Sequence, residues 1–118
     1  MTDHDLADTL DAYAASWSAS SEHERLQAFK ACLAEDFMYT DPNTRTAGYT
    51  ELCSYMEGFQ QQLPGGGFVN RHVAQHHDCL LVSWDLTDAS GAVLSPGTSF
   101  GTVGADGRLA SMTGFFEQ

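Results

Sequence analysis

One aspartate in this sequence stands where it could act as a general base. Asp41 follows the short apolar segment 37–40 and directly precedes Pro42. A carboxylate at the mouth of an apolar pocket can remove a proton from carbon if it reaches that proton directly or through one water. The triplet Asp41-Pro42-Asn43 is also typical of a turn in which the aspartate side chain hydrogen-bonds its own backbone. Both interpretations of Asp41 stay open at this point.

A tyrosine near the N-terminus is the second candidate for chemistry. Tyr13 shares a helical spacing of apolar side chains with Leu10 and Trp17. A buried phenol must find a hydrogen-bond partner. Tyr13 is therefore either a structural tyrosine or a donor to a substrate oxygen.

Histidines and cysteines give no metal signature. His72 and His76 lie four residues apart on an expected strand, which is too far for joint chelation, and no carboxylate completes a ligand set. Cys32, Cys53 and Cys79 are odd in number and widely spaced, a pattern of reduced thiols in a cytoplasm rather than of disulfides. We expect no metal and no cofactor.

The length and the net charge of the chain restrict which partners it can bind. A chain of 118 residues fits a single domain, 1–118, and its net charge of −11 repels nucleic acid and anionic membranes. No apolar run approaches the length of a membrane span, and the acidic start is no secretory signal, so we expect a cytoplasmic protein. The charge fits an acidic surface or, alternatively, an acidic groove for a basic protein.

The elements that must position these residues follow from the apolar periodicity. Helical spacing predicts a helix over 3–18, a second opening at Ser21 with Glu24 completing a capping box, and a third from Gly48 to about Leu63. After the Pro64–Gly67 segment the period becomes two, which predicts strands over 68–77, 79–89, 92–103 and 108–117, in addition to a short strand over 37–40. Three helices followed by an antiparallel meander predict an α+β fold with the helices packed on one sheet.

Strand parity predicts which side chains face the helices. A tight turn at His77-Asp78 places Val73 opposite Val82 and Arg71 opposite Trp84. A four-residue loop at 104–107 places Ser99 opposite Met112 and Gly97 opposite Gly114. The expected inner face then comprises Val69, Arg71, Val73, Leu80, Val82, Trp84, Gly97, Ser99, Gly101, Met112, Gly114 and Phe116.

Two features of this arrangement stay open. An inward Arg71 must be paired or meet an anionic ligand, whereas a shifted register would leave it in solvent. The three inner glycines indicate either a hollow for a ligand or sheet curvature.

The opposite face of the sheet predicts an interface. Its expected members form an apolar patch that soluble proteins usually cover, so we expect a homodimer through this face. They are Leu94, Pro96, Thr98, Phe100, Leu109, Thr113 and Phe115.

Several segments in this order resemble the nuclear transport factor 2-like superfamily, in its SnoaL-like and ketosteroid isomerase-like branch. They are 13–17, 33–42, Gly48, 76–78, 83–84, 106–109 and 114–116. The resemblance implies a cone formed by three helices on a curved, mainly antiparallel sheet, around a small-molecule pocket. It implies Asp41 as the base and Tyr13 as an oxyanion donor. Ser99 stands where those isomerases carry a second, protonated aspartate, which is a departure from their pattern.

The sequence therefore predicts an isomerase or aldol-type cyclase that moves a proton next to a carbonyl, acting on an apolar or weakly acidic small molecule. The alternatives are a non-catalytic ligand-binding or accessory domain and a protein-interaction module of the same fold. The expected pocket residues besides Asp41 and Tyr13 are Trp17, Tyr55, Arg71, Val82, Trp84, Ser99, Met112 and Phe116.

Overall fold

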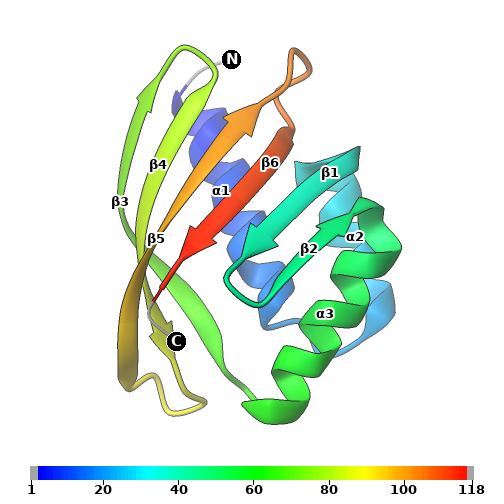
Figure 1. Cartoon of the computed structure of the whole chain (residues 1–118), viewed down its shortest axis with the longest axis vertical. Helices are drawn as coiled ribbons and strands as arrows, with labels where there is room; N and C mark the ends of the chain where they lie inside the picture. The colour runs from blue at the N-terminus through cyan, green and yellow to red at the C-terminus, as the bar shows by residue number, and fades with distance from the viewer. Residues whose placement is uncertain (1–2, 117–118) are drawn as a thin grey trace.

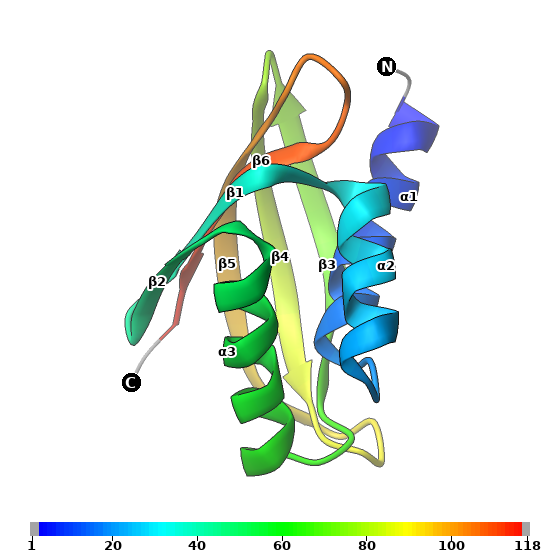
Figure 2. The ribbon, with the colours of Figure 1, turned by 90° about the vertical axis from the view of Figure 1, so that its right-hand side faces the viewer.

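A curved six-stranded sheet with three helices on one of its faces forms the described part of the chain (Figures 1 and 2). This computed structural model describes residues 3–116, with side chains from Leu6 onward. The elements are α1 (Asp3–Trp17), α2 (Glu22–Cys32), β1 (Leu33–Asp41), β2 (Thr44–Ala47), α3 (Gly48–Gln62), β3 (Gly67–His76), β4 (Cys79–Thr87), β5 (Val93–Val103) and β6 (Leu109–Phe115). The expected α+β fold is confirmed.

The strand order is β2-β1-β6-β5-β4-β3. Neighbouring strands are antiparallel except β1 and β6, which run parallel. The four late strands match the segments expected from the period of two, except that the expected end at Glu117 lies outside the described residues. The sequence interpretation missed β2, and it found only the second half of β1.

The helices begin and end close to where their apolar spacing places them. Ser21 caps α2, and its hydroxyl accepts a hydrogen bond from the Glu24 amide at 3.1 Å. The Glu24 carboxylate reaches Ser20 rather than Ser21, so the reciprocal bond of the expected capping box is displaced by one residue. None of the described helices is long and apolar enough to cross a membrane.

The core lies between the helices and the concave face of the sheet. Its fully buried members come from every layer and include Phe29 of α2, Phe37 of β1, Leu52 and Met56 of α3 and Leu80 of β4. The apolar stripe of α1 is buried as expected, with Leu6, Leu10, Tyr13 and Trp17 all facing inward. Apolar burial on this scale is the main term that holds such a sheet to its helices.

The inner-face positions expected for Val69 and Arg71 are wrong. Val73 pairs with Val82 as expected, but a β-bulge between Asn70 and His72 places Asn70, not Arg71, opposite Trp84. The extra residue of a bulge reverses which side chains face inward beyond it. Val69 is exposed, and the Arg71 side chain is 64% exposed and pairs with Asp85 at 3.1 Å.

The register of β5 against β6 differs by two residues from the expected one. Gly101 lies opposite Met112, and Ser99 lies opposite Gly114, because a longer loop and an irregularity near Val103 separate the strands. A shift of two keeps each side chain on its face, so Ser99 and Met112 are buried as expected. Beyond the irregularity the parity changes, and Leu109, expected on the outer face, is fully buried.

Two of the inner glycines accommodate neighbouring side chains. A Cβ on Gly97 would collide with the Trp84 indole, and a Cβ on Gly101 would collide with the Met112 sulfur. The space that these glycines leave is therefore filled by protein rather than open to a ligand.

Candidate active site

A cavity of about 630 Å³ opens between α3 and the sheet. Aromatic rings form much of its wall, and they come from α1, α3, three strands of the sheet (β1, β3 and β4) and the residue that follows β6. They are Trp17, Tyr39, Tyr55, Phe59, Phe68, Trp84 and Phe116. The volume is that of a site for a drug-sized molecule.

These rings are held in place by one another. Trp17 contacts Tyr39, Tyr55, Phe59 and Phe68 edge-on, with ring centroids 5.3 to 6.1 Å apart. Edge-to-face packing at these distances stabilises aromatic clusters. The wall of the cavity is therefore preformed, because the packing of the core fixes its rings before any ligand binds.

Asp41 brings one carboxylate into this wall. Its side chain lines the cavity, and the residue is only 8% exposed. Oδ1 accepts hydrogen bonds from the backbone amides of Asn43 at 2.8 Å and Thr44 at 3.1 Å. These two bonds form the turn that joins β1 to β2, so the turn interpretation of Asp41 holds for this oxygen.

The other carboxylate oxygen faces two phenols. Oδ2 accepts from the Tyr39 hydroxyl at 2.7 Å and from the Tyr55 hydroxyl at 2.8 Å. Tyr39 lies two residues before Asp41 on the same strand and therefore on the same face, whereas Tyr55 reaches across from α3. Asp41 is thus an acceptor in the turn through Oδ1 and a polar group in the cavity wall through Oδ2.

Both phenols are protonated at neutral pH, and burial raises the pKa of each above its ordinary value near 10. Desolvation is the main cause that raises the pKa of Tyr39, and the neighbouring tyrosine and Asp41 charges add to it. Desolvation and the hydrogen bond to Asp41 together raise the pKa of Tyr55 to about 12. Both hydroxyls therefore act as donors to the carboxylate.

Tyr13 faces a different space. It lines a separate void of about 40 Å³, together with Val82, Ser99 and Met112. That void can hold water but not a substrate. Burial raises the Tyr13 pKa, as expected for a phenol packed against Trp17 and Phe37. The two spaces share Trp17, Tyr39, Phe68 and Trp84 in their walls, and Tyr13 belongs to the lining of the smaller one alone.

The other residues expected in the pocket are distributed over the large cavity, the small void and the outer face of the sheet. Trp17 and Trp84 line both spaces, and Tyr55 and Phe116 line the large cavity. The Ser99 hydroxyl accepts a hydrogen bond from the Trp84 indole at 2.9 Å. Arg71 lies on the other face of the sheet, beside a second hollow near Pro96 and Phe115.

Sequence reasoning missed Tyr39, Phe59 and Phe68 as site residues. The signal for Tyr39 was available, because residues i and i+2 of a strand share a face and Asp41 was already a candidate. Phe59 lies on α3 at a helical spacing of four from Tyr55, and its ring stacks on Phe68 at a centroid distance of 5.2 Å.

Among the described residues, no group of three or more His, Cys, Asp or Glu side chains is arranged to hold a metal ion. The Nδ1 atoms of His76 and His77 lie within 3.1 Å of each other at the exposed β3–β4 turn. His77 has a positive φ of 52°, which turns its side chain out of the strand alternation.

The family follows from a comparison of the whole sequence. A family model described as a SnoaL-like domain matches residues 10–112. This chain belongs to the SnoaL-like family. No curated protein matches it.

Solved structures share the fold over nearly the whole chain. A candidate isomerase of the SnoaL-like family from Agrobacterium tumefaciens superposes with a TM-score of 0.86 at 23% identity, covering 98% of this chain and 99% of the other. A candidate polyketide cyclase from Sinorhizobium meliloti gives 0.73 at 18% identity, with coverages of 97% and 99%. A candidate SnoaL-like polyketide cyclase from Jannaschia gives 0.75 at 16% identity, with coverages of 95% and 85%. At these identities the likeness shows the fold.

Proposed function

We propose that this SnoaL-like protein is a cofactor-independent enzyme that moves a proton at a carbon next to a carbonyl, as an isomerase or an aldol-type cyclase. The observation that carries the proposal is the position of Asp41. Among the described residues that line the large cavity, Asp41 is the one charged side chain, and it lies among aromatic rings. A carboxylate in such surroundings is suited to act as a general base toward a bound carbon acid.

The proposed reaction begins when the substrate displaces the Tyr55 hydroxyl from Asp41 Oδ2. Tyr55 is only partly buried and comes from α3, whereas Tyr39 is buried on the same strand as Asp41. Tyr39 therefore keeps the carboxylate in place, and Oδ2 gains a free lone pair that faces the cavity. The released Tyr55 hydroxyl can donate to the substrate carbonyl.

Proton transfer then follows. Asp41 Oδ2 takes the proton from the carbon next to the carbonyl. The electron pair of the broken C–H bond forms a carbon–carbon double bond, and the π pair of the carbonyl moves onto its oxygen to give an enolate. The Tyr55 hydrogen bond stabilises the negative charge that develops on this oxygen. In an isomerase the carboxylic acid returns the proton to another carbon of the same substrate. In a cyclase the enolate carbon forms a bond to a second carbonyl carbon of the substrate, the π pair of that carbonyl moves onto its oxygen, and the Asp41 carboxylic acid returns the proton to this alkoxide.

The names of the structural relatives agree with this class of reaction, because they include an isomerase and polyketide cyclases. Tyr13 and Ser99, the donors first expected, line the small void and have no part in the proposed step.

The test is hydrogen–deuterium exchange at carbon, followed by NMR on a panel of neutral cyclic ketones and β-diketones. The unmodified protein should speed the exchange of at least one panel member. Asp41→Asn should lower that rate by about 100-fold or more, since a positioned base contributes that much. Tyr55→Phe should lower it less severely.

Tyr49→Phe is the matched control, because Tyr49 is also on α3 but its hydroxyl bonds the Leu33 carbonyl at 2.7 Å, away from the cavity. It should leave the exchange rate unchanged. Exchange that persists in Asp41→Asn would refute the assignment of Asp41 as base.

One observation favours the second candidate, a non-catalytic binding domain. The four acceptor positions of the Asp41 carboxylate are all occupied by donors from the chain. If Tyr55 never leaves Oδ2, the carboxylate holds the cavity together and removes no proton. Saturable binding of panel ketones, without any exchange, would support this candidate.

A further inference from the structure

The large cavity contains a negative charge without a positive partner. All four hydrogen bonds to Asp41 come from neutral groups, two phenols and two backbone amides. Among the described residues, the ion pairs found within 4.0 Å are Arg25–Glu57, Arg71–Asp85 and Arg108–Asp106, and none includes Asp41. A buried charge is normally offset by an opposite one.

The basic residues of the chain lie elsewhere. There are five in 118 residues, and none belongs to the described lining of the cavity. Arg25 is buried and contacts Cys53 and Glu57 of α3, and Arg71 lies on the outer face. The other three are Arg45, whose Nε donates to the Thr40 hydroxyl at 3.3 Å at an exposed position, and Lys30 and Arg108, which line another hollow. An anionic ligand would therefore meet a carboxylate and no compensating cation.

The walls suit a positive ligand in a second, independent way. Aromatic faces attract cations through their quadrupole, most strongly when the cation is removed from water. Tyr55, Phe59, Phe68 and Phe116 are partly exposed and line the cavity around Asp41. The net charge of −11 adds a long-range field that draws cations toward the protein.

The hydrogen bonds at Asp41 define the kind of cation. A primary ammonium would have to displace a tyrosine or an amide to reach a carboxylate that already accepts four hydrogen bonds. A quaternary ammonium has no N–H to donate, so it can use the charge of Asp41 without breaking any of these bonds.

We propose that the cavity binds an organic cation of the quaternary ammonium type carried on an apolar body. This inference goes beyond the proposed function, because it concerns the charge of the ligand and does not require that any proton be moved.

The experiment uses three compounds of similar shape and different charge: phenyltrimethylammonium, the neutral tert-butylbenzene and the anionic benzenesulfonate. Trp17 and Trp84 line the cavity, so their fluorescence reports binding without a label. On the unmodified protein the cation should bind about tenfold more tightly than its neutral isostere, in keeping with a desolvated cation–π contact. The anion should bind most weakly.

Asp41→Asn should bring the affinities for phenyltrimethylammonium and tert-butylbenzene within about twofold of each other, because an amide of similar shape loses the charge that distinguishes the two compounds. Asp106→Asn is the matched control. It changes the net charge equally, but Asp106 is exposed in the β5–β6 loop, so the preference should persist.

If Asp41→Asn does not fold, the affinities of the three compounds for the unmodified protein still test the inference. Neutral binding as tight as cation binding, or tighter, would overturn the inference. The exchange assay on neutral ketones is independent of this result, so the two proposals can fail separately.

Discussion

The two oxygens of Asp41 serve different parts of the molecule. Oδ1 closes the turn after β1, and Oδ2 ties β1 to α3 through Tyr55. An Asn side chain retains an acceptor for the turn but turns the second position into a donor that faces two phenol donors. The stability of each Asp41 variant must therefore be measured beside its activity or its affinity.

This role could be predicted from the sequence only in part. Asp-Pro-Asn identified both the turn and the candidate base, and strand alternation would have placed Tyr39 beside Asp41. Tyr55 was expected in the pocket, but its bond to Asp41 depends on how α3 lies across the sheet. That packing is a tertiary property which no local spacing contains.

Buried phenols make the protein sensitive to alkali. The pKa of Tyr13 and that of Tyr39 are raised by burial, and that of Tyr55 is raised to about 12. In the unfolded chain a phenol ionises near pH 10. Between these values the folded state holds more protons than the unfolded state, so the stability that is present below about pH 10 is lost as the pH rises.

The expected result is a melting temperature that falls as the pH is raised from about 8 to about 11, in step with unfolding-linked phenolate absorbance. Tyr39→Phe should make the fall shallower, because it removes one of the groups that must stay protonated. A melting temperature that is constant over this range would contradict the burial of the Tyr13 and Tyr39 hydroxyls.

At the scale of elements, the strands could be predicted well and their irregularities could not. The period of two and the turn residues located β3 to β6 within a few positions. The bulge near Arg71 and the irregularity near Val103 each reversed the faces beyond them. A bulge inserts one residue without a required sequence signal, so parity counted from a turn holds only as far as the first bulge.

The glycines of β5 give an element-scale prediction. Gly97→Ala should destabilise the protein by about 1–3 kcal/mol, because the new Cβ must displace the buried Trp84 indole from beside β5. Gly58→Ala is the contrasting variant. Gly58 lies inside α3 with no atom within 4 Å of an added Cβ, so alanine should stabilise the helix by up to about 1 kcal/mol.

Urea unfolding followed by circular dichroism measures both variants. If Gly97→Ala were as stable as the unmodified protein, the close contact between the Trp84 ring and β5 would be refuted.

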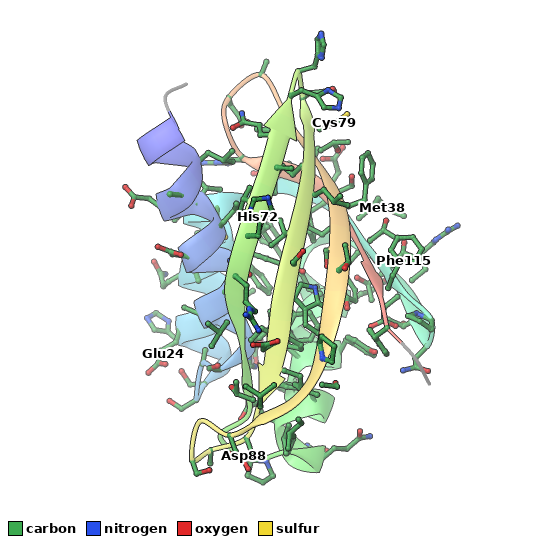
Figure 3. The ribbon with its side chains drawn as sticks, turned by 90° about the vertical axis from the view of Figure 1, so that its left-hand side faces the viewer. Glu24, Met38, His72, Cys79, Asp88 and Phe115 are labelled. Carbon is green, nitrogen blue, oxygen red and sulfur yellow. The ribbon has the colours of Figure 1, made fainter. Side chains whose placement is uncertain are left out.

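At the scale of the whole molecule, the helices cover one face of the sheet and leave the other uncovered (Figure 2). Exposed apolar side chains gather on that outer face, and Met38 and Phe115 of the neighbouring strands β1 and β6 are marked in Figure 3. Leu94 and Phe100 are also exposed there, as the sequence predicts, and Leu81 joins them. Leu109 does not, because it is buried in the core.

This face leads to the last prediction, that two copies of the chain associate through it. Phe100 occupies its centre, since it lies opposite Leu81 of β4 on one side and Thr113 of β6 on the other. A monomer would leave these side chains in water, and soluble proteins seldom leave so large a patch uncovered. Sedimentation at high micromolar concentration should therefore give twice the chain mass of 12.8 kDa.

Phe100→Lys should convert the dimer to a monomer, because it places two like charges near the axis of a symmetric contact. Gln61→Lys adds the same charge at an exposed position of α3, away from the outer face, and should leave the dimer intact. Phe100 is already exposed in the monomer, so its replacement should lower the stability of the fold little beyond what the loss of the partner explains. A monomeric unmodified protein would refute the prediction, and the outer face would then have to meet either solvent or another protein.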